Sequence, residues 1–273
     1  MSSTQRAVQV GSLKAVPQVT EATNSLPCSV MEETLAQEPH RVTMRGSHAW
    51  DAHDAYLFDV DGTLLRSADR IHVDSFSEAV KQVVGERISL DGVTLHGGTD
   101  TAILAEALER SGVHPGRLEA HREAILQRMA EIVESRRNDL RFRRMPGVVA
   151  ILDWLQARDA LLGVATGNLE RIGWTKLEMC GLRAWFALGG FSDHFPVRAD
   201  LVGDAAARAQ SRLGRKPASI CVVGDTPRDI EAARSNGLPV IAVATGNYSF
   251  AELDRLEPEV CCSSFCALME WPR

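Results

Sequence analysis

The chain has 273 residues, of which 45% are hydrophobic and 24% charged, and its formal net charge is −6. This length suits one large domain or two smaller ones, and the acidic balance argues against a general nucleic-acid binder. No apolar segment is long enough to cross a bilayer, the first residues lack the apolar core of a secretory signal, and the few scattered cysteines do not suit a disulfide scaffold. We therefore expect a cytoplasmic protein that binds neither nucleic acid nor membrane.

Residues 1–50 are rich in polar residues and show no sustained hydrophobic period. A segment of this kind cannot bury enough apolar surface to offset the entropy lost on ordering it. We therefore predict a mostly disordered N-terminal tail.

The first predicted strand leads into two carboxylates. Residues 55–58 form a short apolar run typical of a buried strand, and Asp59 and Asp61 follow it, before a turn at Gly62 and Thr63. Alternate residues of a strand face the same side, so both carboxylates should point the same way off its carboxyl end. Two carboxylates this close resist ionising together unless a cation compensates them, and Mg²⁺ takes such oxygen ligands. A strand that merely ends in an Asp-Gly turn is the alternative.

Residues 68–144 are predicted to be helical throughout. Apolar residues recur at helical spacing over residues 76–84, 103–108 and 118–133, with no strand-like run between them. An arginine-rich stretch, residues 136–144, closes the segment, and we interpret it as a solvated face or linker. We therefore predict an all-helical insert after the first strand.

From residue 145 onward, apolar runs alternate with helices. We predict strands over residues 161–166, 186–191, 219–224 and 238–244, the last of the sheet. Near-continuous apolar strands that alternate with helices are typical of a parallel sheet covered on both faces. The predicted fold class is therefore α/β. A doubly wound parallel sheet is formed by residues 51–67 and 145–273, and the helical domain, residues 68–144, is inserted into it.

Polar residues with related chemistry follow several of these strands. Asp59 and Asp61 follow the first strand, Thr166 ends the second, and Asp225 and Asp229 follow a later one. In an open parallel sheet, sites form outside the carboxyl ends of the strands. A nearby loop also offers a cation, Arg198. Carboxylates, a hydroxyl and a guanidinium at one edge predict a carboxylate nucleophile, a divalent metal and phosphate donors.

This set of motifs resembles the haloacid dehalogenase superfamily, in its phosphoglycolate-phosphatase-like group with a helical cap. The D-x-D-G-T motif is residues 59–63, the second motif is Thr166, and the G-D-x-x-x-D motif is residues 224–229. The third motif is normally a lysine, and Arg198 is the nearest candidate, with Lys216 the other cation to consider. The turn at residues 97–100 is similar to the segment with which such caps approach the substrate. The resemblance extends from about residue 54 to the end of the chain.

The resemblance implies a Mg²⁺-dependent phosphatase that hydrolyses a small phosphorylated metabolite, such as phosphoglycolate or a sugar phosphate, through an aspartyl phosphate. Asp59 would be the nucleophile and Asp61 the general acid and base, with Thr166 and Arg198 as further catalytic residues. Two larger sets complete the predicted site. Phosphate would be bound at Gly62, Thr63, Gly167, Asn168, Thr99 and Asp100, and Mg²⁺ at Asp59, Asp61, Asp225 and Asp229.

Other functions share parts of this pattern. A phosphomutase of the β-phosphoglucomutase type has every core residue, so only an assay separates it from a hydrolase. A non-enzymatic module that signals through a phosphorylated aspartate is less favoured, because receiver domains are shorter and lack the helical insert. Halide-removing relatives lack an acid at the position of Asp61. Phosphonate-cleaving relatives use a cap lysine, for which Lys81 on a predicted helix surface is a poor candidate.

Overall fold

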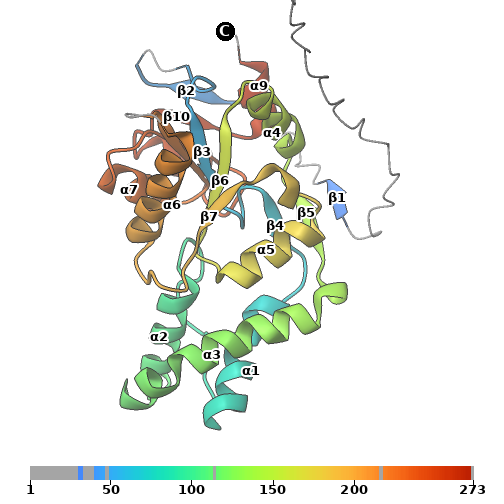
Figure 1. The fold of residues 1–273 in the computed structure, drawn as a ribbon, viewed down its shortest axis with the longest axis vertical. Coiled ribbons are helices and arrows are strands. Elements are labelled where there is room, and N and C mark those ends of the chain that lie inside the picture. The colour runs from blue at the N-terminus through green and yellow to red at the C-terminus, as the bar shows by residue number, and fades with distance from the viewer. Residues whose placement is uncertain (1–29, 33–39, 47–48, 113–114, 215–217, 272–273) are drawn as a thin grey trace, which may run out of the picture.

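The computed structural model describes residues 30–32, 40–46, 49–112, 115–214 and 218–271. Figure 1 shows two parts, a sheet with helices on both faces and a smaller group of helices below it. The doubly wound α/β fold predicted from the sequence is confirmed by the sheet topology. Within the described residues, no helix is long and apolar enough to cross a membrane.

The main sheet has seven strands in the order β2-β10-β9-β8-β3-β6-β7. All neighbouring pairs are parallel except β2 with β10. The strands are β2 (Val42–Met44), β3 (Ala55–Phe58), β6 (Leu161–Ala165), β7 (Leu188–Gly190), β8 (Ile220–Gly224), β9 (Val240–Val243) and β10 (Val260–Cys262). The strand that carries the two aspartates, β3, therefore lies inside the sheet between β8 and β6.

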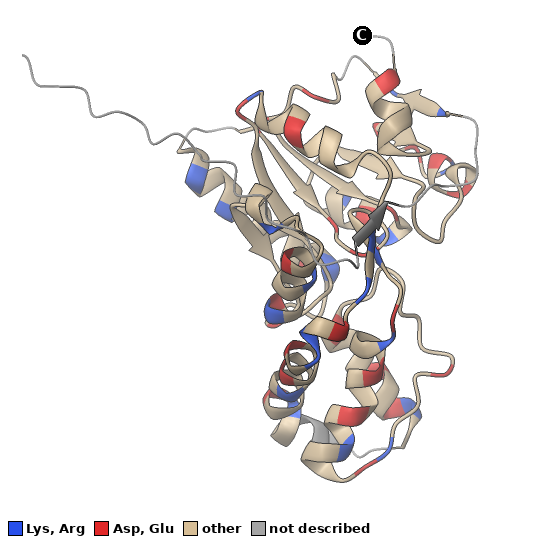
Figure 2. Cartoon of the chain, turned by 90° about the vertical axis from the view of Figure 1, so that its right-hand side faces the viewer, with Lys and Arg blue, Asp and Glu red and all other residues tan. Residues whose placement is uncertain are grey.

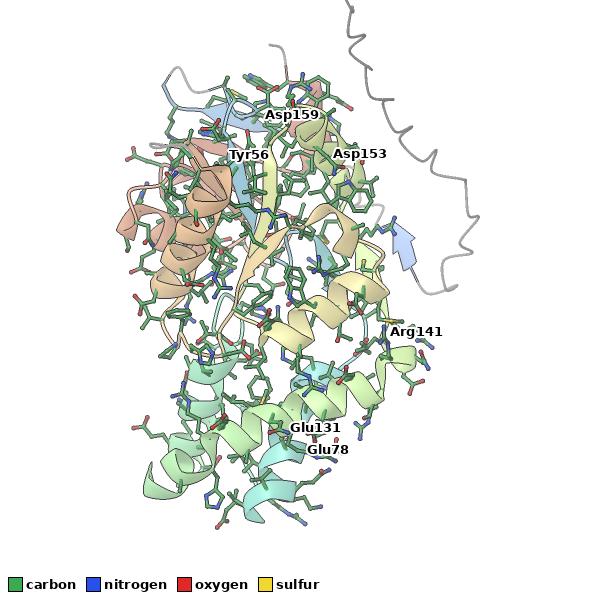
Figure 3. The ribbon with its side chains drawn as sticks, viewed as in Figure 1. Tyr56, Glu78, Glu131, Arg141, Asp153 and Asp159 are labelled. Atoms are coloured by element: carbon green, nitrogen blue, oxygen red, sulfur yellow. The ribbon has the colours of Figure 1, made fainter. Side chains whose placement is uncertain are left out.

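Alternate side chains of the strands feed two hydrophobic cores, one on each face of the sheet. Tyr56 and Phe58 face α4, α5 and α9, whereas Ala55 and Leu57 face α6, α7 and α8. Tyr56 is labelled in Figure 3, where it lies inside the sheet. The helices are α4 (Val148–Gln156), α5 (Glu170–Met179), α6 (Arg198–Leu213), α7 (Pro227–Ser235), α8 (Phe250–Asp254) and α9 (Phe265–Glu270). Burial on both faces explains why these strands are continuously apolar.

The inserted part contains α1 (Ile71–Val84), α2 (Asp100–Arg110) and α3 (Pro115–Ser135), followed by a short 3₁₀ turn, Arg137–Asp139. Figure 3 labels Glu78 on α1 and Glu131 on α3, where the two helices pack. Their polar edge is tied by Arg136 Nη2 to Glu78 Oε1 at 2.7 Å and by Arg128 Nε to Gln82 Oε1 at 2.6 Å. Acidic and basic residues are interspersed over this part (Figure 2), so it carries no face of a single charge.

A small sheet in the order β1-β5-β4 joins the two parts. Its strands are β4 (Leu65–Ser67), β5 (Phe142–Arg144) and β1 (Val30–Glu32), and β4 runs antiparallel to β5. The predicted helical insert was wrong at its end, because residues 142–144 form a strand rather than a linker. Phe142 is buried and Arg143 is exposed, whereas Arg144 is half-buried and its Nε donates to the Cys180 carbonyl at 2.9 Å. Arg141, labelled in Figure 3, immediately precedes this strand.

Two further predictions need correction. The tail was predicted to extend to residue 50, but β2 pairs with β10 and Trp50 is only 3% exposed, so the core begins at about residue 40. Val30–Glu32 within the predicted tail also form a strand, β1, which pairs with β5. Residues 1–29, 33–39 and 47–48 lie outside the described residues. The strand at residues 238–244 was predicted to be the last, yet β10 extends the sheet beyond it. β2 and β10 are each three residues long, as are the unpredicted strands β1, β4 and β5, and strands this short show no periodic pattern.

Candidate active site

Three adjacent strands deliver the predicted site residues to one edge of the sheet. Asp59 follows β3, Thr166 follows β6 and Asp225 follows β8. They border a cavity of about 380 Å³ that is closed from the other side by the helical insert. The insert contributes residues from α1, from the turn before α2 and from α2 itself: His72, Val73, Phe76, Leu95, His96 and Ile103.

Three buried carboxylates lie together at the carboxyl edge of the sheet. One oxygen from each of Asp59, Asp225 and Asp229 lies within 4.8 Å of the other two. Burial raises the pKa of Asp59 to about 6, although the charge of Arg198 works in the opposite direction. Burial and the neighbouring charges of Asp59 and Asp229 hold the pKa of Asp225 well above its usual range. The cluster is therefore short of positive charge, which is the condition under which a bound cation is stabilised.

Arg198 supplies a positive charge to this cluster. Its Nη2 atom lies 2.6 Å from Asp59 Oδ1 and 2.6 Å from Asp229 Oδ1. We expected Arg198 in a loop at the rim, but it is the first residue of α6 and only 7% of it is exposed. Starting a helix there turns the side chain back toward the sheet. The alternative cation, Lys216, lies outside the described residues.

Asp229, predicted to help hold the metal, is also bonded to two other residues of the site. Its Oδ1 atom accepts from Arg198 Nε at 2.8 Å. Its Oδ2 atom accepts from the Thr226 backbone N at 3.0 Å and from Thr226 Oγ1 at 2.7 Å. The latter contacts form a capping box that starts α7. Both carboxylate oxygens thus have protein partners, and Asp229 orients Arg198. Because one of its oxygens also lies with those of Asp59 and Asp225, its role as a metal ligand stays a prediction.

The turn after β3 closes tightly around Asp225. Thr63 Oγ1 donates to Asp225 Oδ1 at 2.8 Å, and Gly62 adopts a φ of +94°. A Cβ atom on Gly62 would lie 2.4 Å from Asp225 Oδ2, and one on Gly246 would lie 1.7 Å from the same atom. Only glycine therefore fits at either position. Thr63, expected to bind phosphate, is instead fully buried against Asp225.

The carboxylates of Asp59 and Asp225 fit a hard divalent cation. Their oxygen atoms are close together, and burial and the neighbouring carboxylates raise both pKa values. The side chain of Asp61 does not belong to this group, because it points toward α5. If Asp61 contributes to a metal site, its main-chain carbonyl is the available group.

The carboxylate of Asp61 is held by Lys176 on α5 and by Asn168 in the turn after β6. Its Oδ2 atom accepts from Lys176 Nζ at 2.7 Å and from Asn168 Nδ2 at 2.8 Å, while 40% of its side chain stays exposed. Burial works to raise the pKa of Asp61, but the charge and hydrogen bond of Lys176 outweigh it, so the pKa lies below its usual value. Lys176 was not among the predicted site residues. Its signal is a charged residue one turn after Ile172, on the apolar face of α5.

The cap turn docks on the core instead of leaving its side chains free. Thr99 Oγ1 donates to the Pro196 carbonyl at 2.6 Å, and Asp100 Oδ2 accepts from the Leu169 backbone N at 2.8 Å. The Asp100 backbone N also donates to the Gly167 carbonyl at 2.7 Å. Both side chains were expected to bind phosphate. Their partners here make them contacts between cap and core.

Gly167 lies directly beneath this turn. A Cβ atom at Gly167 would lie 2.0 Å from the Gly98 carbonyl oxygen, so a side chain would push the cap turn away. Thr166 and Asn168 flank Gly167 and both border the cavity. The structure therefore brings Asp59, Thr166 and Asp225 to one edge, and it brings Arg198 to them from α6.

Comparison with known proteins identifies the family of this chain. The sequence profile of the family described as haloacid dehalogenase-like hydrolase matches residues 56–243 of this chain. That range runs from β3 to the end of β9, so it spans the site and the helical insert.

Two curated relatives are phosphoglycolate phosphatases. The protein from Agrobacterium fabrum is 27% identical over 215 residues, covering 78% of this chain and 89% of its own length. The protein from Synechococcus elongatus is 29% identical over 196 residues, covering 70% and 84%. Among solved structures, a predicted phosphoglycolate phosphatase from Haemophilus somnus superposes with a TM-score of 0.58 at 19% identity, covering 80% of this chain and 97% of that one. The last likeness concerns the fold alone.

Proposed function

Since the chain belongs to the haloacid dehalogenase-like hydrolases and is a phosphatase similar to phosphoglycolate phosphatases, we propose that it hydrolyses a small phosphate monoester through an aspartyl phosphate on Asp59. The single observation that carries this proposal is the position of the Asp59 carboxylate. It lies at the bottom of the cavity, beside Asp225 and within 2.6 Å of Arg198. A buried carboxylate paired with a guanidinium is suited to attack a phosphorus atom whose oxygens need positive charge.

In the first step an Asp59 oxygen attacks phosphorus while the bond from phosphorus to the leaving oxygen breaks. Asp61 transfers its proton to that leaving oxygen, which departs as an alcohol. The carboxylate of Asp61 is held ionised in the free protein, and a phosphate dianion beside it raises its pKa, because like charges disfavour ionisation. Thr166 donates its hydroxyl to a phosphate oxygen. Arg198 stabilises the negative charge shared by Asp59 and the phosphoryl group.

In the second step a water molecule attacks the phosphorus of the aspartyl phosphate. Asp61, now a carboxylate, accepts a proton from that water, and the bond between phosphorus and the Asp59 oxygen breaks. Inorganic phosphate leaves, Asp59 is regenerated, and Asp61 again carries the proton needed for the next turnover. The same residue thus serves as acid and then as base, which requires that it reach both the leaving oxygen and the water.

We assign the metal site to Asp59, Asp225 and the main-chain carbonyl of Asp61, with Mg²⁺ as the expected ion. Bound there, Mg²⁺ supplies charge neutralisation for the phosphoryl oxygens and the attacking carboxylate. Asp225 is fixed for this purpose by Thr63 and by the two glycines that enclose it. Asp229 acts through Arg198, whose guanidinium it orients.

The cavity supports a small ester as the substrate. Its cap side combines apolar residues, Val73, Phe76, Leu95 and Ile103, with polar ones, Asp69, His72, His96 and Asp100. Its volume of about 380 Å³ leaves room for a small leaving group beside the phosphate. Phosphoglycolate and sugar phosphates are the esters to test first. A phosphomutase would use the same carboxylates but would exclude water from the aspartyl phosphate while a bisphosphate turns round.

The proposal is tested by measuring phosphate release from a panel of small phosphate esters, with and without Mg²⁺. We expect Mg²⁺-dependent release without any bisphosphate activator, and loss of that release in Asp59→Asn, because an amide is a poor nucleophile. Asp51→Asn is a matched control, since Asp51 contacts Trp154 far from the cavity. Isomerisation of a sugar phosphate that requires a bisphosphate would instead favour the phosphomutase, and retained activity in Asp59→Asn would contradict the nucleophile assignment.

A further inference from the structure

Lys176 is a buried lysine whose contacts lead directly into the site. It lies on α5, is 2% exposed, and its Nζ atom is 2.7 Å from Asp61 Oδ2 and 2.8 Å from Asn168 Oδ1. It does not border the cavity itself. Lysine side chains are seldom fully buried unless they are paired, so the burial of Lys176 needs a physical explanation.

The contacts of Lys176 fix the orientation of the Asn168 amide. An ammonium group has three donors and no acceptor, so the Asn168 atom that faces it must be the carbonyl oxygen. The amide nitrogen then faces the opposite way. It donates to Asp61 Oδ2 at 2.8 Å and to Thr166 Oγ1 at 2.7 Å.

This orientation in turn sets the direction of the Thr166 hydroxyl. Thr166 Oγ1 accepts from Asn168 Nδ2 and, at 3.4 Å, from the Asn168 backbone N. A hydroxyl has one proton and two lone pairs. With both lone pairs facing donors, the proton is directed to another acceptor, and Thr166 borders the cavity in which the phosphate would lie. Lys176 and Asn168 also hold one oxygen of Asp61, which leaves its other oxygen for the cavity.

We propose that Lys176 is a positioning residue that, through Asn168, makes Thr166 a phosphate donor and fixes the carboxylate of Asp61 for proton transfer. The proposal rests on the phosphatase mechanism above. It extends that mechanism by a residue that touches neither substrate nor metal. The buried ammonium group of Lys176 orients the Asn168 amide, and that amide in turn orients Thr166 and Asp61.

If Lys176 served only to stabilise the fold, an apolar replacement would leave the rate of catalysis unchanged. A buried ion pair is often replaced by an apolar side chain of similar volume at little cost in stability. Lys176→Met keeps the length of the side chain and removes its donors, so it separates packing from hydrogen bonding. Asn168→Asp makes the complementary change: it can still pair with Lys176, but it cannot donate to Thr166 or Asp61, and the two carboxylates repel.

The experiment measures kcat and KM for phosphate release by wild type, Lys176→Met, Asn168→Asp and the control Lys81→Met, an exposed lysine on α1. We expect kcat to fall by about tenfold or more in the first two variants, with KM changed much less, because misplaced catalytic groups lower the rate of the chemical step. Lys81→Met should match wild type. Thermal melts verify that each variant is folded, and Asn168→Asp keeps the test informative if Lys176→Met does not fold.

Double variants test whether Lys176 acts through the proposed partners. Combined with Thr166→Ala or Asp61→Asn, Lys176→Met should cost clearly less than it does alone, because the group it positions is already missing. Losses that multiply, or a wild-type kcat in Lys176→Met or Asn168→Asp, would overturn the inference while leaving the phosphatase proposal intact. Absence of phosphate release by the wild-type protein on every ester would instead mean that the proposed function has failed.

Discussion

Arg198 and Asp229 are joined through two nitrogen atoms of the guanidinium, with Nε 2.8 Å and Nη2 2.6 Å from the same Asp229 Oδ1 atom. The Nη2 atom also lies 2.6 Å from Asp59 Oδ1. Asp229 therefore fixes the plane of the guanidinium that compensates the proposed nucleophile. An arginine suits this place because its planar fork can contact two carboxylates at once.

Arg198→Ala should lower kcat by about 10² or more, which is the typical cost of removing one oriented donor from a transition state. Arg198→Lys should retain part of the activity, because it keeps the charge but loses the fork. The buried position of Arg198 adds a second expectation. The Ala variant should also melt at a lower temperature, since it leaves neighbouring buried carboxylates without their partner. Steady-state kinetics and thermal melts check both. Near-normal turnover by Arg198→Ala would rule out this electrostatic role.

Asp225→Asn should make the metal-free protein more stable and the enzyme inactive. Removing one of three crowded carboxylates relieves repulsion and the cost of burying charge. The expected gain is a few degrees in melting temperature, the usual size for about 1 kcal/mol in a protein of this length. Melting curves in EDTA and in Mg²⁺ check this. Wild type should gain stability from Mg²⁺ and the variant should not. A variant that is equally stabilised by Mg²⁺ would remove Asp225 from the metal site.

Asp61→Asn should lose far more activity on alkyl phosphates than on an activated aryl phosphate. A good leaving group needs little protonation, whereas an alkoxide depends on the acid. The measurement compares kcat for the two substrate types in wild type and variant. Equal losses on both would argue that Asp61 is not the proton donor.

Gly167→Ala should impair turnover by disturbing the docked position of the cap. Its Cβ would lie 2.0 Å from the Gly98 carbonyl oxygen, so the turn before α2 must move away. Gly85→Ala is a useful control, because Gly85 has a φ of +76° with nothing within 4 Å of an added Cβ. That control should lose some stability but keep its kcat/KM. Wild-type kcat/KM in Gly167→Ala would indicate that this cap position is not needed for catalysis.

Two cap residues should have separable effects on substrate choice. Asp100 ties the cap turn to Leu169, so Asp100→Asn should lower kcat/KM for all esters by a similar factor. Val73 borders the apolar side of the cavity, so Val73→Ser should change the ranking of the esters instead. The same ester panel measures both. A changed ranking in Asp100→Asn with none in Val73→Ser would reverse these assignments.

The strand that carries Asp59 and the insert after it could be predicted because their signals are local. A short apolar run followed by two acids marks a strand end, and long periodic stretches mark helices. By contrast, β2 pairs, among the described residues, only with β10, from which most of the chain separates it. No local pattern in the sequence predicts such a contact.

The site was predictable to the extent that its residues end strands. Asp59, Thr166 and Asp225 could be placed together for that reason, and their position after adjacent strands is what the structure has. Thr99 and Asp100 were expected to bind phosphate. Tertiary contacts use both side chains to dock the cap, but Asp100 also borders the cavity, so its role there stays a prediction. Lys176 was missed because a lysine on a helix is ordinarily assigned to the surface. Only the packing of α5 against the sheet shows that it points inward.

The central claim is that Asp59 attacks phosphorus, so that hydrolysis takes place by two successive displacements. The most direct test uses a phosphate ester that is chiral at phosphorus through oxygen isotopes, hydrolysed in isotopically labelled water, with the product configuration read by ³¹P NMR. Each in-line displacement inverts the phosphorus centre, so two of them predict net retention of configuration. Net inversion would show that water attacks the substrate directly and would contradict the aspartyl-phosphate mechanism.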